Sequence, residues 1–294
     1  MAVQKNHCSK IPFAAYIELT KPRISTLVLV TTALGFFLGG KGIASWPLFF
    51  TTLFGAGLTC AGASALNHYL ERDADSKMKR TQNRPLPRGI ISPSNALSFG
   101  IILTLAGVIL LSVRVNLLTA YLSLLTAFLY VLVYTPMKRI SWLNTTIGAI
   151  PGAIPPMGGW AAAAGQLDAG AWALFLILFL WQHPHFYAIA WMFKEDYRRA
   201  GFKMLPVIEK DGRRTFFQIL LFAALLIPAS TLPTILGISG RAYLYGALLS
   251  GIWLFVLGVM LSISKSFRSA QKLLRATVIY LPLLLFLIVL DLGF

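Results

Sequence analysis

Residues 89–113 read GIISPSNALSFGIILTLAGVILLSV, a stretch of 25 residues without one charged side chain. About 18 apolar residues are enough for an α-helix to cross the hydrocarbon core of a membrane. Inside lipid, every backbone N–H and C=O must find its partner within the protein, which favours helices over irregular chain. The stretch therefore predicts a membrane-spanning helix.

Eight further uncharged stretches are similar in composition. They cover residues 24–40, 42–70, 115–137, 140–167, 169–193, 215–240, 242–264 and 276–290. The first and last are short but continue into weakly polar flanks, and prolines at 151, 155 and 156 predict a bend or break within 140–167. Since alternating patterns typical of a membrane β-barrel are absent, we expect an all-α, polytopic membrane protein with nine transmembrane helices.

The overall composition excludes a soluble or disordered chain. Of 294 residues, 57% are hydrophobic, 13% aromatic and only 12% charged, whereas a soluble domain has about 25% charged residues. The aromatic and apolar content is too high for disorder. Cys8 and Cys60 lie in a polar tail and an apolar run, so they predict neither a disulfide framework nor a metal cluster.

The net charge of +16 is explained by topology. With nine helices, all of the 26 Lys and Arg residues except Lys41, Arg114 and Arg241 lie on the side of the N-terminus. Basic residues mark the cytoplasmic side, which predicts a cytoplasmic N-terminus, an outside C-terminus and no nucleic-acid partner. Because neither a cleavable signal nor an Arg-rich transit segment is visible, we expect a bacterial inner membrane.

The chain is expected to form one domain over residues 1–294. A cytoplasmic tail over 1–23 includes an interfacial amphipathic stretch at 11–20. Two cytoplasmic loops, at 71–95 and 194–214, carry acids among bases. These loops are the candidates for the chemistry.

The first loop continues a row of three oxygen-bearing side chains. Asn67, Glu71 and Asp75 are spaced i, i+4 and i+8, which aligns them on one face if the preceding helix continues. A solvated loop with local ion pairs is the alternative, but Asn67 lies inside an apolar run, where polar groups are functional by default. The row predicts a Mg²⁺ site, with Asp73 as a further candidate ligand. The bases that follow are suited to phosphate oxygens: Lys77, Lys79, Arg80 and Arg84.

A second polar group interrupts the run before the other loop. Gln182, His183 and His185 surround Pro184, which removes a helical hydrogen bond. The histidines are i, i+2 neighbours on different helix faces, so they do not share one ion without distortion. One of them facing an iron or an acidic substrate is the better interpretation. The residues leave open which one.

The order of these motifs resembles the UbiA intramembrane prenyltransferase superfamily, in the form of its heme-modifying branch. The run Asn67-x-x-x-Glu71-Arg-Asp73-x-Asp75 resembles the first aspartate-rich motif. Further pieces follow in the expected order: Thr20-Lys-Pro-Arg-Ile24, Tyr134-Thr-Pro136, Trp181-Gln-x-Pro-His185-Phe and Lys194-x-Asp196-Tyr. The chain differs from the superfamily pattern at three positions: Glu71, His68, and Ala200, which follows Asp196 where a second acid is common.

The resemblance implies a central cavity and Mg²⁺-assisted transfer of the farnesyl group of farnesyl diphosphate to a vinyl group of protoheme IX. It implies catalytic roles for Asn67, Glu71, Asp75, Lys194 and Asp196. It implies diphosphate-binding roles for Arg23, Arg80, Arg84, Lys138 and Lys203. It implies heme binding by His185, or alternatively His183, with Gln182. It also implies delivery of the product to a heme A synthase or terminal oxidase assembly.

Two other functions fit parts of the sequence. A sister prenyltransferase acting on an aromatic or quinone-precursor ring would favour a complete second acidic motif and no Trp181-Gln-x-Pro-His185-Phe. A transporter or heme-binding protein without chemistry predicts acids in the middle of the membrane. The acids of the two loops lie at one predicted membrane face.

Overall fold

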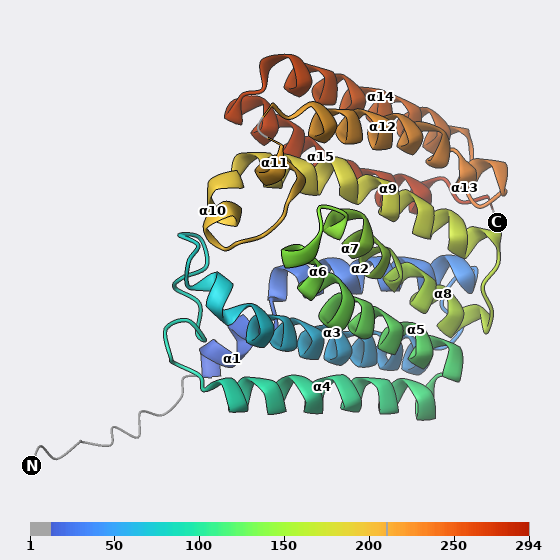
Figure 1. Cartoon of the computed structure of the whole chain (residues 1–294). Coiled ribbons are helices and arrows are strands. Elements are labelled where there is room, and N and C mark those ends of the chain that lie inside the picture. Colours follow the sequence, from blue (N-terminus) through green and yellow to red (C-terminus); the bar gives the residue numbers. More distant parts are fainter. Residues whose placement is uncertain (1–12, 210, 294) are drawn as a thin grey trace, which may run out of the picture.

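The computed structural model describes residues 13–209 and 211–293, most of which are helical (Figure 1). Eight segments of this part are long and apolar enough to cross a membrane. They are α2 (Pro22–Gly39), α3 (Trp46–Asp75), α4 (Pro93–Arg114), Leu117–Ile140, α9 (Ala169–Met192), Arg213–Ile235, α14 (Arg241–Ser264) and α15 (Phe267–Leu290). The predicted all-α, polytopic membrane architecture is confirmed.

Two of these segments are composite. Leu117–Ile140 consists of α5 (Leu117–Phe128), the π-helical turn η1 (Leu129–Tyr134) and α6 (Thr135–Ile140). Arg213–Ile235 consists of α12 (Arg213–Ala229) and α13 (Leu232–Ile235). A π-helical turn widens the helix and is frequent at functional sites.

The run at 140–167 is broken, as its prolines predicted. It forms α7 (Asn144–Ala153) and α8 (Pro155–Ala164), which meet at Ile154. Pro155 and Pro156 have no N–H with which to continue the hydrogen bonding of α7. Over the described residues the count by helix length is therefore eight, and nine spanning helices and the orientation in the membrane stay predictions.

Close backbone contact fixes α3, which carries the first polar row, against α4. A Cβ added at Gly62 would overlap the backbone of Thr104, and one added at Gly107 would overlap that of Thr59. Small residues allow such approach between helices in lipid, where van der Waals packing drives association. The row therefore sits on a firmly held helix.

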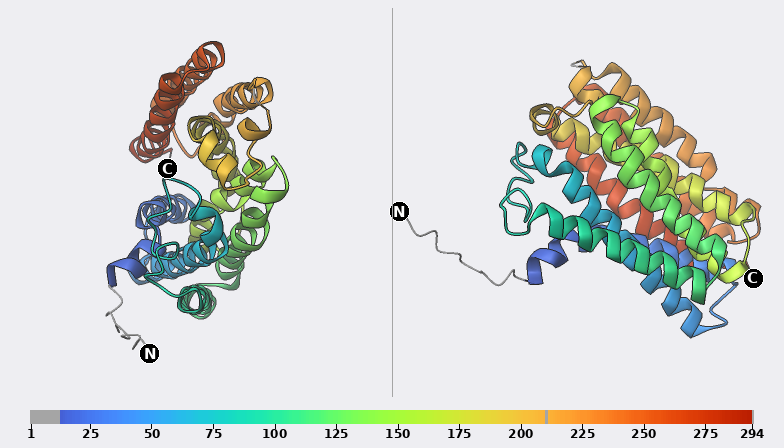
Figure 2. Two further views of the ribbon diagram at one scale, coloured as in Figure 1. Left: turned by 60° about the vertical axis from the view of Figure 1, so that its left-hand side comes forward. Right: turned by 60° about the horizontal axis from the view of Figure 1, so that its bottom comes forward.

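α9 is the most enclosed of the long helices. In its spanning window 67% of the residues are buried, against 28–44% in the other seven segments. It lies among α7, α12 and α15 (Figure 2), and the Trp181 indole N–H donates to the Thr277 carbonyl of α15 at 2.8 Å. Pro184 lies inside α9 without ending it. The polar side chains of α9 are therefore held inside the protein.

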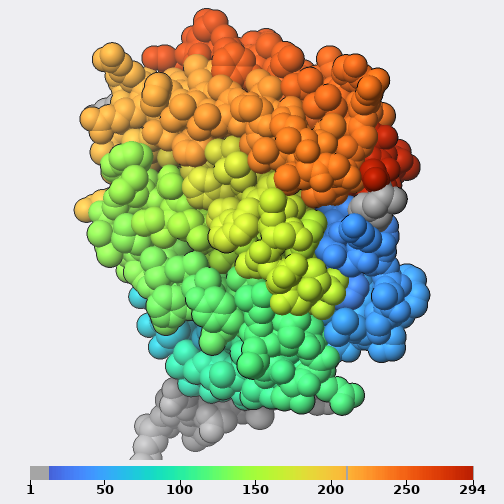
Figure 3. Space-filling view, turned by 90° about the vertical axis from the view of Figure 1, so that its right-hand side faces the viewer, coloured from blue at the N-terminus to red at the C-terminus, as the bar shows by residue number. Residues whose placement is uncertain are grey.

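The two acid-rich loops, at 71–95 and 194–214, lie at one end of the bundle, on the left in Figure 1. This end holds α1 (Phe13–Leu19), α6, α10 (Lys194–Arg199), α11 (Leu205–Ile208) and the end of α3. At the opposite end, which faces the viewer in Figure 3, Asp168 and Asp291 accept backbone N–H groups of Gly170 and Tyr243. Those acids serve as helix caps. Residues 1–12 of the predicted tail, with Cys8, lie outside the described residues.

Candidate active site

The last turns of α3 carry the predicted row of oxygen-bearing side chains. The helix continues to Asp75, so Asn67, Glu71 and Asp75 share one face, as their spacing predicted. All three are buried, with 0%, 6% and 0% of their surface exposed. Carboxylates so enclosed need positive partners.

Each member of the row has a different basic partner. Lys138 on α6 places its Nζ 2.6 Å from Glu71 Oε1. Arg84, in the loop after α3, donates from Nη1 to both oxygens of Asp75 at 2.9 and 2.8 Å. Lys21, directly before α2, donates from Nζ to Asn67 Oδ1 at 2.5 Å. Three separate segments therefore bring positive charge to one helix face.

Lys21 is a candidate site residue that the sequence pattern did not single out. Arg23, the predicted phosphate ligand from the same segment, has an exposed side chain, whereas Lys21 points to Asn67 and to the Tyr130 hydroxyl at 3.2 Å. Its backbone is left-handed, with φ of 50°. Burial lowers the pKa of Lys21 to about 7, and the Glu71 carboxylate only partly offsets this.

The amide of Asn67 is held in one orientation by the widened helix opposite. Its Nδ2 donates to Thr135 Oγ1 at 2.9 Å, and that hydroxyl donates to the Tyr130 carbonyl at 2.8 Å. With the amide nitrogen engaged in this way, Oδ1 faces Lys21. Asn67 therefore offers its oxygen to the site.

Three neighbours of the row are placed differently from it. The Asp73 side chain is 72% exposed and lies 3.8 Å from Arg72. Arg80 is exposed, with its guanidinium 5.4 Å from the centre of the Phe193 ring. His68 is buried, and neither of its ring nitrogens has a hydrogen-bond partner among the described residues.

The second acid-rich stretch is more open and pairs locally. On α10, Glu195 pairs with Arg198 at 2.6 Å, and Asp196 pairs with Arg199. Asp196 is the buried acid of this helix. The Lys194 Nζ lies 4.5 Å from the centre of the Trp191 ring. The Lys203 side chain is exposed, but its backbone N–H donates to the Lys138 carbonyl at 2.7 Å and so links this stretch to α6.

The polar residues of α9 point in different directions. Gln182 Nε2 donates to the Ala149 carbonyl of α7 at 3.0 Å. His183 is fully buried, with its ring stacked on Phe222 at 3.5 Å between centroids. His185 is half-buried, and its Nδ1 lies 2.8 Å from the Thr277 hydroxyl of α15. Of the three, His185 is the side chain that is not enclosed.

The oxygen donors of the α3 row fit a magnesium ion only if a bound phosphate supplies further oxygens to it. Among the described residues, no three His, Cys, Asp or Glu side chains lie close enough together to hold a metal ion by themselves. The amide oxygen of Asn67 and the carboxylates of Glu71 and Asp75 are hard donors, and Mg²⁺ is usually bound by one or two carboxylates together with substrate phosphates. The chemistry of the donor set is therefore that of an ion shared with a phosphate.

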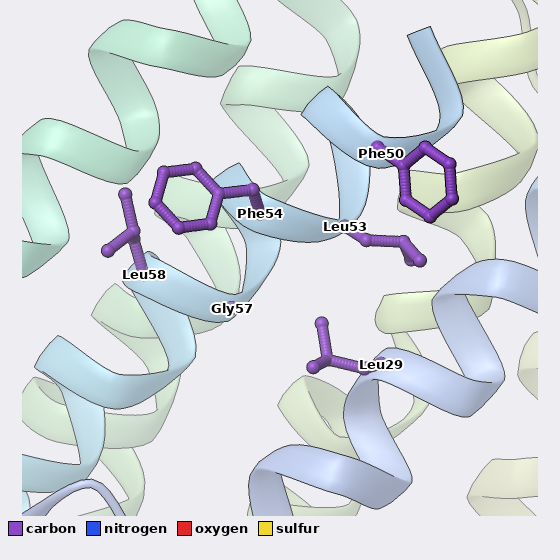
Figure 4. Close-up of a pocket in the computed structure, with 6 residues that line it drawn as sticks. All are labelled: Leu29, Phe50, Leu53, Phe54, Gly57 and Leu58. Atoms are coloured by element: carbon purple, nitrogen blue, oxygen red, sulfur yellow. The ribbon is translucent and has the colours of Figure 1, made fainter. Parts of the chain in front are cut away.

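Two grooves on the flank of the bundle lack this chemistry. Leu29 of α2 and five residues of α3, including Phe50 and Phe54, line an apolar groove of about 560 Å³ (Figure 4). A groove of about 800 Å³ between α1, α3 and α4 adjoins it at Leu58. Among the residues that the structure describes, those lining the two grooves carry no charged side chain. Such exposed apolar surface is suited to lipid contact.

Comparison with known proteins agrees with the fold. The family model of the UbiA prenyltransferase family matches residues 28–288. Proteins named protoheme IX farnesyltransferase from Solibacter usitatus and Salinibacter ruber are 49% and 43% identical to this chain, each over 94% of it and 98% of their own length.

Solved structures share the fold at lower sequence identity. A digeranylgeranylglyceryl phosphate synthase structure has a TM-score of 0.80 at 20% identity, over 95% of this chain and 97% of its own. A UbiA homolog from Archaeoglobus fulgidus bound to GPP and Mg²⁺ has a TM-score of 0.66 at 15% identity, over 94% and 99%. From the match over most of its length and its identity to these relatives, the chain belongs to the UbiA prenyltransferase family.

Proposed function

We propose that this prenyltransferase moves the farnesyl group of farnesyl diphosphate to a vinyl group of protoheme IX. The observation that carries the proposal is the buried row of Asn67, Glu71 and Asp75, faced by three cations from three segments. The names of relatives that are up to 49% identical support protoheme as the acceptor. We further propose a single domain over residues 1–294 in a bacterial inner membrane.

Departure of the diphosphate is the step that the row supports. The C1–O bond of farnesyl diphosphate breaks, and its electron pair leaves with the diphosphate. Mg²⁺ held by Asn67, Glu71 and Asp75 together with diphosphate oxygens would supply Lewis-acid neutralisation of that charge. Lys138, Arg84 and Lys21 would then donate to the remaining oxygens, and charge-assisted hydrogen bonds of this kind are strong when water is excluded. The proposed outer contributors are Arg23, Arg80, Lys194, Asp196 and Lys203.

The vinyl group of protoheme accepts the farnesyl cation, and water completes the reaction. The vinyl π electrons form the new C–C bond to C1, and water captures the cation left beside the porphyrin ring. The proton of that water passes to the departed diphosphate. Until the vinyl group attacks, the allylic cation must be kept from water, and the surrounding apolar helices support this. We propose that His185 holds the heme, and that a heme A synthase or a terminal oxidase assembly receives the product.

The test is a reaction with defined substrates. Purified protein is incubated with protoheme, farnesyl diphosphate and Mg²⁺, and the heme is followed by mass spectrometry. We expect a product heavier by one farnesyl group and one hydroxyl group, and we expect EDTA to prevent its formation and added Mg²⁺ to restore it. A folded protein that prenylates 4-hydroxybenzoate and leaves protoheme unchanged would contradict the proposal in favour of an aromatic acceptor.

A further inference from the structure

We propose that His185 binds the protoheme iron through Nε2, and that Thr277 is the positioning residue that prepares His185 for this bond. The inference rests on the proposed function, because it takes protoheme as the substrate. It follows from the hydrogen bonds between α9 and α15, which determine where the imidazole proton lies.

The single proton of the Thr277 hydroxyl is already donated within α15. Thr277 Oγ1 donates to the Leu274 carbonyl at 2.7 Å. A hydroxyl group has one proton to donate, and a carbonyl can only accept. The 2.8 Å contact between Thr277 Oγ1 and His185 Nδ1 must therefore be donated by the imidazole. His185 accordingly carries its proton on Nδ1.

The other ring nitrogen of His185, Nε2, is the one that can bind a metal. In a neutral imidazole protonated at Nδ1, Nε2 presents a lone pair. Nε2 of His185 makes no hydrogen bond to the described residues, and the side chain is only half-buried. A metal-ligating histidine has this arrangement, with its other N–H donated to a fixed acceptor. A heme propionate is itself an acceptor, so this tautomer suits the iron and disfavours a propionate.

Trp181 and Thr277 together fix the orientation of the His185 ring. Trp181, one helical turn before His185, stacks on it with 5.0 Å between centroids and 24° between planes. The Trp181 indole donates to the main-chain carbonyl of Thr277 at 2.8 Å. Thr277 is fully buried, so its backbone holds Trp181 and its hydroxyl holds His185. The same residue of α15 thus fixes both the tautomer and the plane of the ligand.

His183 shares the Nδ1 contact to a fixed acceptor but has neither a free Nε2 nor an accessible ring. Its Nδ1 lies 2.8 Å from the Phe179 carbonyl, which can only accept, and its Nε2 lies 3.3 Å from Thr146 Oγ1. Phe222 covers one face of the ring at 3.5 Å. Both nitrogens are engaged and the side chain is fully buried, so an iron has no route to a lone pair. The geometry favours His185 over His183, the alternative that the sequence left open.

The experiment measures protoheme binding to the purified full-length protein in detergent. Thr277→Val removes the hydroxyl group at nearly constant volume, and Thr277→Ser keeps it. Loss of an outer-shell partner of a metal ligand costs about 10- to 100-fold in metal affinity. We expect Thr277→Val to weaken protoheme binding by about 10-fold or more and Thr277→Ser to restore it. Metal-free protoporphyrin IX should bind wild type and both variants alike.

Resonance Raman spectra of the ferrous heme complex test the bond itself. The iron–histidine stretching band should be present in the wild type, lost in His185→Ala and shifted in Thr277→Val. The inference is overturned if the band survives in His185→Ala, or if Thr277→Val binds protoheme as the wild type does. Equal weakening of protoheme and protoporphyrin IX binding also overturns it, because that result points to packing or to a propionate.

Turnover of the wild type separates this inference from the proposed function. A wild type that forms farnesylated heme while Thr277→Val leaves the spectrum unchanged contradicts the inference alone. A wild type that has the iron–histidine band but forms no farnesylated heme contradicts the proposed function alone. Thermal unfolding in detergent identifies a variant that has lost its fold, and the Thr277→Ser comparison then carries the test.

Discussion

Two acid-rich stretches of similar composition have different structures. In the stretch at 67–84, Glu71 and Asp75 are buried, and the partner of Glu71, Lys138, is 67 residues away in sequence. In the stretch at 194–203, Glu195 and Asp196 pair with bases three residues later on one short helix, and both of those bases are 45% exposed. One stretch joins distant segments, and the other pairs within itself.

The difference indicates which charges carry function. An exposed local ion pair contributes only about 0–1 kcal/mol, because solvent screens the charges and holding two long side chains in place costs entropy. Carboxylates enclosed at the membrane end of a helix are costly, so each needs a compensating charge. Buried carboxylates of this kind therefore mark functional sites in membrane proteins. We therefore expect substitutions in the first stretch to reduce activity far more than equivalent ones in the second.

The largest effect is expected at Asp75. Asp75→Asn keeps the size of the side chain but removes the charge that would bind Mg²⁺ and that pairs with Arg84 at 2.8 Å. Loss of one electrostatic contact to a developing charge costs about 100- to 1,000-fold in rate, and we expect kcat for farnesyl transfer to fall by this amount. Asp73→Asn is the matched control, because its side chain is exposed. Equal loss in both variants would contradict the special role of the buried row.

Lys138 should give the next largest effect. Lys138→Met retains the apolar stem but leaves the Glu71 carboxylate buried without its partner at 2.6 Å. A charged hydrogen bond contributes about 1.5–3 kcal/mol, so we expect kcat/KM for farnesyl diphosphate to fall by about 10- to 100-fold. Arg139→Met changes the neighbouring exposed base and should leave kcat/KM within about 2-fold. If Lys138→Met is as active as Arg139→Met, the ion pair has only a structural role.

Lys21 and Arg23 lie in one segment and test two assignments of the diphosphate ligand. The structure favours Lys21, whereas the sequence predicted Arg23. Lys21 contacts Asn67, whereas Arg23 is exposed. We expect Lys21→Met to raise KM for farnesyl diphosphate by about 10-fold, since one charge-assisted contact to the diphosphate is lost. Arg23→Met should change KM by less than about 2-fold. The reverse order would favour the assignment made from the sequence.

The sequence could predict features that depend on local spacing. The row on α3 follows from 3.6-residue periodicity, the break between α7 and α8 from prolines, and the divergence of His183 and His185 from their i, i+2 spacing. The cations of the row could not be predicted, because Lys21 and Lys138 are 46 and 67 residues from their partners. Lys21 has a left-handed backbone that directs its side chain inward. This conformation could not be predicted, because a residue directly before a proline normally favours extended backbone.

The smallest effect is expected in the second stretch. Arg198→Ala removes the pair with Glu195, in which the two side chains are 45% and 64% exposed. Since such a pair contributes about 0–1 kcal/mol, we expect the free energy of unfolding to fall by no more than about 1 kcal/mol and turnover to stay within about 2-fold of wild type. Thermal unfolding and the farnesyl transfer assay measure the two quantities. A loss of turnover as large as that in Asp75→Asn would show that local pairing on α10 does not separate the two stretches, and that both contribute charge to the same reaction.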